Sequence, residues 1–319
     1  MNFRKGAFVC LIFTTLITSC KKEPAITMTA ELEFKSRALL GEGAFWNHES
    51  QELFWVDILG KSVNIYNPKN KSNRSFPLPF RVGTVVPQTD STAVVALENG
   101  IYILNLNNRL LTNLSNVEED IPTNRFNDGK CDPNGNLWVG SMQLDETLPE
   151  ASLYKVAPDG TTWKMRDNIT ISNGIVWTKN GRTMYYIDTP TAKIRAYDFN
   201  MESSTISNER TVVEVAPEVG YPDGMAIDEE DMLWVGLWNG NAVARFNPKN
   251  GELIQKIEVP AHNVTACAFG GPDLDILYIT TARKDMTDEE IEKYPLAGSI
   301  FSIKPGVKGV NSQFFGTIK

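Results

Sequence analysis

A short motif recurs along the chain, each time at the same distance before an apolar segment. A side chain that carries an oxygen precedes or follows a glycine, a turn rich in Asp, Pro, Asn and Gly comes next, and an apolar run begins roughly ten residues further on. The copies are Gly41-Glu42-Gly43, Asn127-Asp128-Gly129, Ser172-Asn173-Gly174 and Pro222-Asp223-Gly224. Glu42, Asn127, Asn173 and Asp223 therefore occupy one position of a repeat.

The apolar runs themselves come in six pairs, spaced about 40 to 50 residues apart, in the range of propeller blades. The first runs span 53–57, 94–97, 137–140, 184–188, 233–236 and 277–280, and the second runs span 62–66, 100–104, 152–156, 194–197, 242–246 and 299–303. Gly, Asn, Asp and Pro between them are typical of hairpin turns. Six units of about four strands predict an all-β, six-bladed β-propeller. Two separate β-sandwiches are the alternative, but they would not explain the shared position.

The propeller is expected to span residues 31–319 without an internal boundary. Its ring should close by pairing a strand around residues 32–37 with the last blade, near Phe301 or Phe314. The charged insertion at 287–293 is the one segment that favours a helix.

The first 19 residues have the pattern of an export signal. Arg4 and Lys5 precede an apolar run at 7–17 that is too short for an ordinary membrane-spanning helix. The boundary before Cys20 resembles the lipobox of bacterial lipoproteins, which implies lipidation of Cys20 and a tether over residues 20–30. We therefore expect an exported, membrane-anchored protein, periplasmic or at the cell surface, that touches the membrane only through its lipid. An ordinary secretory signal is the alternative.

Composition restricts the partners and the metals. The formal net charge of −8 argues against nucleic-acid binding, because such proteins carry a basic surface. Two histidines make a His-rich zinc site unfavourable. Cys131 and Cys267 remain after the leader, and whether they pair is left open. A monomer is expected.

The repeated position predicts a metal site. The innermost strand of every propeller blade lines the central channel, so Glu42, Asn127, Asn173 and Asp223 should converge on the axis. Two carboxylates brought together would repel and would be costly to bury without a counter-charge. A divalent cation removes that conflict, and carboxylate and amide oxygens suit Ca²⁺, Mg²⁺ or Mn²⁺. Ca²⁺ is the expected ion, and Zn²⁺ is the least favoured alternative.

Several motifs together resemble the regucalcin/gluconolactonase family, also called the senescence marker protein family. They lie in order between residues 39 and 310: Leu40-Gly41-Glu42-Gly43, Asn124-Arg125-Phe126-Asn127-Asp128-Gly129-Lys130, Ile171-Ser172-Asn173-Gly174, Pro222-Asp223-Gly224-Met225, Phe269-Gly270-Gly271 and Thr280-Thr281-Ala282-Arg283. The resemblance implies a six-bladed propeller with one divalent cation on its axis.

The resemblance also implies roles for individual residues. Glu42, Asn173 and Asp223 would be the metal ligands, and Arg125 would bind substrate. Asn127 would contact the metal directly, or through substrate or water. An acidic residue after the third blade's first strand would face the substrate. Asp145 is chosen for that role, and Glu146 is the open alternative because the local sequence departs from the family pattern. Trp238 is a candidate for a cavity wall.

The expected activity is hydrolysis of sugar-acid lactones. A metal would polarise the ring carbonyl, and Asp223, or water that it orients, would be the general base. Two other functions stay open. One is phosphotriester hydrolysis, as in squid-type diisopropylfluorophosphatase on the same scaffold, and the other is a non-catalytic propeller that binds calcium or a partner.

Overall fold

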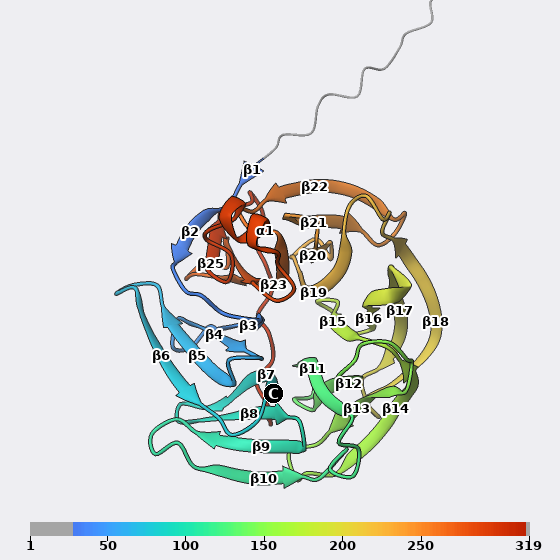
Figure 1. Ribbon diagram of the computed structural model, residues 1–319. Helices are drawn as coiled ribbons and strands as arrows, with labels where there is room; N and C mark the ends of the chain where they lie inside the picture. Colours follow the sequence, from blue (N-terminus) through green and yellow to red (C-terminus); the bar gives the residue numbers. More distant parts are fainter. Residues whose placement is uncertain (1–27, 317–319) are drawn as a thin grey trace, which may run out of the picture.

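The computed structural model describes residues 28–316, which form six antiparallel sheets arranged around a central axis (Figure 1). The predicted six-bladed β-propeller is confirmed. The leader, Cys20 and residues 20–27 of the tether lie outside the described residues.

The first three sheets follow one another along the chain, each running from the axis outward in four strands. They contain β3 (Gly41–Asn47), β4 (Glu52–Asp57), β5 (Ser62–Asn67) and β6 (Ser72–Pro77); β7 (Val82–Thr89), β8 (Thr92–Leu97), β9 (Gly100–Asn105) and β10 (Leu111–Ser115); and β11 (Asn124–Cys131), β12 (Leu137–Gln143), β13 (Ala151–Val156) and β14 (Thr162–Ile169).

The other three sheets have the same order, with additions from the N-terminal strands. They contain β15 (Ser172–Trp177), β16 (Thr183–Asp188), β17 (Lys193–Asn200) and β18 (Thr205–Glu214); β19 (Tyr221–Ile227), β20 (Leu233–Trp238), β21 (Ala242–Asn247) and β22 (Glu252–Glu258); and β23 (Asn263–Gly270), β24 (Ile276–Ala282) and β25 (Ile300–Ile303). The runs predicted from sequence are the second and third strands of the six blades.

The N-terminal strands close the ring. β2 (Glu31–Phe34) forms the outer strand of the last sheet and places Leu32 opposite Phe301, as predicted. Phe314 takes no part in this pairing and packs instead against Phe45, with ring centroids 6.0 Å apart. β1 (Met28–Thr29) adds parallel to β22, so the folded body begins at Met28, slightly before the predicted boundary at residue 31.

An aspartate–tryptophan pair explains why two of the repeats fold alike. The Asp132 carboxylate accepts the indole N–H of Trp138 at 2.9 Å, and Asp228 accepts that of Trp234 at the same distance. Each aspartate also accepts backbone N–H groups of the turn before the tryptophan, which fixes the hairpin between first and second strands. Both tryptophans are fully buried between blades.

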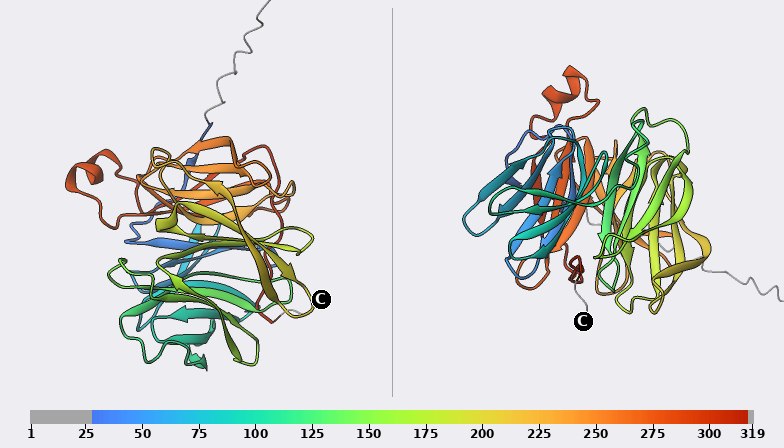
Figure 2. Two further views of the ribbon diagram at one scale, coloured as in Figure 1. Left: turned by 90° about the vertical axis from the view of Figure 1, so that its right-hand side faces the viewer. Right: turned by 90° about the horizontal axis from the view of Figure 1, so that it is seen from below.

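The two faces of the propeller carry different segments. The insertion predicted to be helical forms α1 (Asp288–Lys293) on one face, with Thr287 in a capping box. Residues 304–316, which we call the C-terminal strap, cross the opposite face near the axis (Figures 1 and 2). Among residues 28–316 no helix has the length and apolar character needed to span a membrane.

Candidate metal centre and substrate cavity

A β-bulge shortly after the start of each innermost strand aims the repeated side chains at the axis. The strand register shifts next to Glu42, Asn127, Asn173 and Asp223, in β3, β11, β15 and β19. A bulge inserts a residue and redirects the neighbouring side chains. Gly43 follows Glu42 with φ +61°, a left-handed conformation that favours glycine. The motif found in the sequence is therefore the sequence pattern of these bulges.

The four predicted residues meet in one buried cluster at the α1 face. Each is no more than 5% exposed. The Asn127 amide donates to Asn173 Oδ1 at 3.1 Å and to the Ser172 carbonyl at 2.7 Å. The Asn173 amide N–H donates to Thr189 Oγ1 at 2.8 Å, which turns Asn173 Oδ1 toward the cluster. Thr189 was not recognised from the sequence.

The two carboxyl groups of the cluster are short of positive partners. Burial, and then repulsion from Asp128, raises the pKa of Glu42 to about 8. Burial, and then the Glu42 carboxyl, raises the pKa of Asp223 well above its ordinary value. Glu42 and Asp223 lie within hydrogen-bonding reach of each other. Asp223 Oδ1 is buried, and no hydrogen-bond partner is found for it within residues 28–316.

These features fit a divalent cation. An unpartnered buried carboxylate oxygen and two carboxyl groups held together are the conditions that a bound cation would relieve. Glu42, Asn173 and Asp223 could supply the ligands. The described residues contain no group of three or more His, Cys, Asp and Glu suited to a metal, because the third donor here is an amide. Carboxylate and amide oxygens together suit Ca²⁺ or Mg²⁺ better than Zn²⁺.

Arg125 and Asn127 form a unit beside the cluster. Arg125 donates to Asn127 Oδ1 at 2.6 Å and to the Phe126 carbonyl at 3.1 Å. The amide oxygen of Asn127 is therefore occupied, which leaves Glu42, Asn173 and Asp223 as the oxygen donors. Burial lowers the pKa of Arg125 to about 10, which keeps the guanidinium charged at neutral pH.

A cavity of about 270 Å³ opens above this cluster. Arg125, Glu146 and Lys284 line it together with the cluster itself. Of the two acidic candidates, Glu146 faces this cavity. Asp145, the residue chosen from the sequence, is exposed and accepts the backbone N–H of Thr147 at 3.4 Å instead. The left-handed backbone at Glu146, φ +62°, turns the loop at this point, which sequence spacing could not show.

Lys284 closes one side of the cavity and was not recognised from the sequence. Its amine lies 3.0 Å from a Glu146 carboxylate oxygen and 2.7 Å from Asp285. The Asn263 side chain donates to the Lys284 carbonyl at 2.9 Å and fixes this part of the chain. Lys284 follows the Thr280-Thr281-Ala282-Arg283 motif directly, so that motif was the available signal.

The remaining walls are mainly apolar. They comprise Leu40, Met142, Ile171, Pro190, Tyr221 and Trp238. Trp238 thus lies where it was predicted, while Trp46, Trp55, Trp138 and Trp234 are buried in the blades. Cys131 and Cys267 are both free and buried, and neither lines this cavity.

Residues 40–283 match the family described as SMP-30/Gluconolactonase/LRE-like region. The chain belongs to this family. It is 40% identical to a Bacillus subtilis protein named "Putative sugar lactone lactonase YvrE" over 275 residues, 86% of this chain and 94% of the relative. It is 37% identical to Xenopus laevis regucalcin, with the same shares of the two chains covered.

A solved structure extends the comparison to three dimensions. The Agrobacterium tumefaciens protein described as a calcium-binding protein, regucalcin, superposes with a TM-score of 0.87 at 28% identity, covering 91% of this chain and 98% of that one. The family membership expected from the sequence motifs is confirmed, and so is the propeller.

Proposed function

We propose that this protein is a divalent-metal-dependent hydrolase of sugar-acid lactones. The observation that carries the proposal is the buried pair of Glu42 and Asp223, with an unpartnered Asp223 oxygen, at the base of a cavity that Arg125 enters. The lactonase name of the Bacillus subtilis relative supports the reaction class. The calcium-binding description of the Agrobacterium tumefaciens structure supports Ca²⁺ as the cation, with Mg²⁺, Mn²⁺ and Zn²⁺ as alternatives.

Each residue of the site has a distinct role in this proposal. Glu42, Asn173 and Asp223 would hold the cation, which when bound supplies Lewis-acid polarisation of the lactone carbonyl. Asp223 Oδ1 accepts the proton of the attacking water as general base. Arg125 presents forked N–H donors to the sugar hydroxyls or to the developing carboxylate. Asn127 has no titrating proton and holds Arg125 and Asn173 in place.

Glu146 and Lys284 complete the substrate cavity at its mouth. The Glu146 carboxylate can accept hydrogen bonds from sugar hydroxyls, and the ion pair with Lys284 restricts where that carboxylate can lie. The volume of about 270 Å³ suits one sugar ring rather than a long chain.

The test is hydrolysis of a panel of aldonolactones by chelated protein to which defined metals are added back. We expect acid release that disappears on chelation and returns with Ca²⁺. Metal binding without acid release from any lactone would instead support the non-catalytic propeller. Hydrolysis of a phosphotriester in preference to every lactone would support the phosphotriesterase.

We also propose that Cys20 is lipidated and anchors the exported protein. The proposal rests on the leader pattern in the sequence alone. Cys20→Ala should release the protein from membranes while specific activity stays unchanged, as measured by fractionation and lactone hydrolysis. Retention of the variant in the membrane fraction would contradict lipidation.

A further inference from the structure

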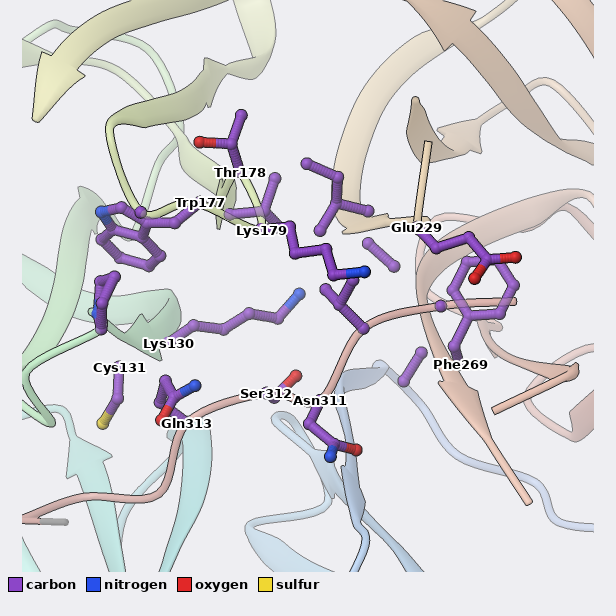
Figure 3. A pocket seen from close by; sticks show the side chains of 18 of the residues that line it. Lys130, Cys131, Trp177, Thr178, Lys179, Glu229, Phe269, Asn311, Ser312 and Gln313 are labelled. Atoms are coloured by element: carbon purple, nitrogen blue, oxygen red, sulfur yellow. The ribbon is translucent and has the colours of Figure 1, made fainter. Parts of the chain in front are cut away.

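A second cavity, of about 430 Å³, lies at the other end of the axial channel and has no part in the proposed lactonase site (Figure 3). Its walls come from the last residues of β11, β15, β19 and β23, and from the C-terminal strap. The metal cluster lies at the first residues of the same strands, so the two sites face opposite ends of the channel. The volume is typical of small-molecule sites.

The C-terminal strap is held in place along its length, so this cavity is already formed in the protein. The Gly309 N–H donates to the Leu274 carbonyl at 2.8 Å, and the Phe315 N–H donates to that of Pro87 at 2.9 Å. A Cβ atom at Gly309 would lie 2.1 Å from Phe269 Cβ, so glycine allows the strap to seat directly on β23. The strap thereby joins blades that are remote in sequence.

Two lysine side chains point into this cavity from adjoining blades (Figure 3). Lys130 is partly buried, and its amine donates to the Met225 carbonyl. Neither Lys130 nor Lys179 has a carboxylate within ion-pair distance among residues 28–316. Because an ammonium group has three N–H donors, Lys130 retains donors for a ligand.

The rest of the lining indicates the kind of ligand. Trp177, Phe269, Met201 and Ile227 provide apolar surface, and Glu229 at the rim is the one acidic residue of the lining. Ser312 and Gln313 of the strap add neutral polar groups opposite the lysines (Figure 3). A cavity with two cations, one peripheral carboxylate and aromatic walls is suited to an anion that carries a ring or another apolar body.

We propose that this cavity is a second binding site, for a small organic carboxylate or phosphate. Lys130 and Lys179 contact the anionic group, and the apolar body lies against Trp177 and Phe269. The proposal does not depend on the lactonase activity, because its residues are separate from the metal cluster and from the substrate cavity.

The test is calorimetric titration of the chelated full chain with benzoate, acetate and inorganic phosphate. Benzoate should bind at one site per chain and more tightly than acetate, because only benzoate has a ring for the aromatic walls. Lys179→Met and Lys130→Met should each weaken benzoate binding about tenfold, as expected for one charge-assisted contact. Lys69→Met, which removes an exposed lysine from a turn of another blade, should leave the affinity unchanged.

Three results would overturn the proposal: no benzoate binding, equal affinities in Lys179→Met and Lys69→Met, or loss of binding in Arg125→Ala. The last result would assign the anion to the substrate cavity. If Lys130→Met fails to fold, Lys179→Met decides, because that side chain is exposed and its backbone N–H bond to Asp231 is retained. Phosphate binding as tight as that of benzoate would remove the apolar part of the proposal.

Discussion

The two ends of the axial channel are built from the same innermost strands but differ in charge and in how their side chains are held. At the α1 face, short side chains such as Asp223 and Asn173 lie on bulges and are fixed by neighbouring blades. At the strap face, Lys130 and Lys179 reach the cavity on long stems. Geometry is therefore tightly specified where we propose chemistry, and charge alone is supplied where we propose binding.

The largest effect is expected from Asp223→Asn, which keeps an oxygen donor and removes the proposed base. Lactone hydrolysis should fall by roughly two to four powers of ten, the range of general-base contributions, even when metal saturates the variant. Turnover and metal occupancy would be measured together, the latter by elemental analysis. Full activity in the metal-saturated variant would leave Asp223 as a ligand only.

Glu42→Gln is the matched control for that experiment. It also removes one negative charge from the cluster, but Glu42 is proposed as a ligand and not as the base. Added metal should therefore restore a measurable share of its activity. Equal and unrecoverable losses in both variants would contradict the separate roles.

Arg125→Ala should have the next largest effect. Removing a charge-assisted contact of about 1.5–3 kcal/mol should lower kcat/KM by roughly one to two powers of ten. Metal content should stay near that of the unaltered protein, because Arg125 is not among the proposed ligands. A variant that no longer bound metal would show that Arg125 supports the cluster rather than the substrate.

The excess negative charge at the α1 face should appear in the pH dependence of stability. The pKa of Glu42 rises from its ordinary 4.5 to about 8 in the folded, metal-free protein. Between these values the folded state binds more protons than the unfolded state, so the free energy of unfolding should fall as pH rises. Urea unfolding of chelated protein at pH 5 and pH 8 would measure the loss.

Two controls accompany the pH experiment. Glu42→Gln should flatten the dependence, because its amide does not titrate. Saturating Ca²⁺ should reverse the loss at pH 8, since the cation binds the ionised carboxylates. A chelated protein that became more stable over this pH range would show that the cluster is not short of positive charge.

The smallest effect is expected from Lys284→Met at the mouth of the cavity. The Lys284–Glu146 pair is partly exposed, so its loss should cost about 0.2–1 kcal/mol and raise KM about two- to fivefold. Lys304→Met removes a comparable surface ion pair with Asp275 and should not change KM. Equal KM values in the two variants would exclude a role for Lys284 in holding Glu146.

The sequence alone determined the features that repeat. The six pairs of strands, the shared position of Glu42, Asn127, Asn173 and Asp223, and the pairing of Leu32 with the last blade all follow from a period in the chain. A propeller turns one position of a period into one place near its axis, so a pattern in sequence becomes a cluster in space.

Only the tertiary structure decided what the loops and the strap do. Glu146 rather than Asp145 faces the substrate cavity because of a local left-handed turn, and its partner Lys284 is 138 residues away. The cavity beneath Lys130 exists because the last residues of the chain fold back across four blades. These contacts join segments outside the repeat, and their geometry depends on packing that no periodic pattern records.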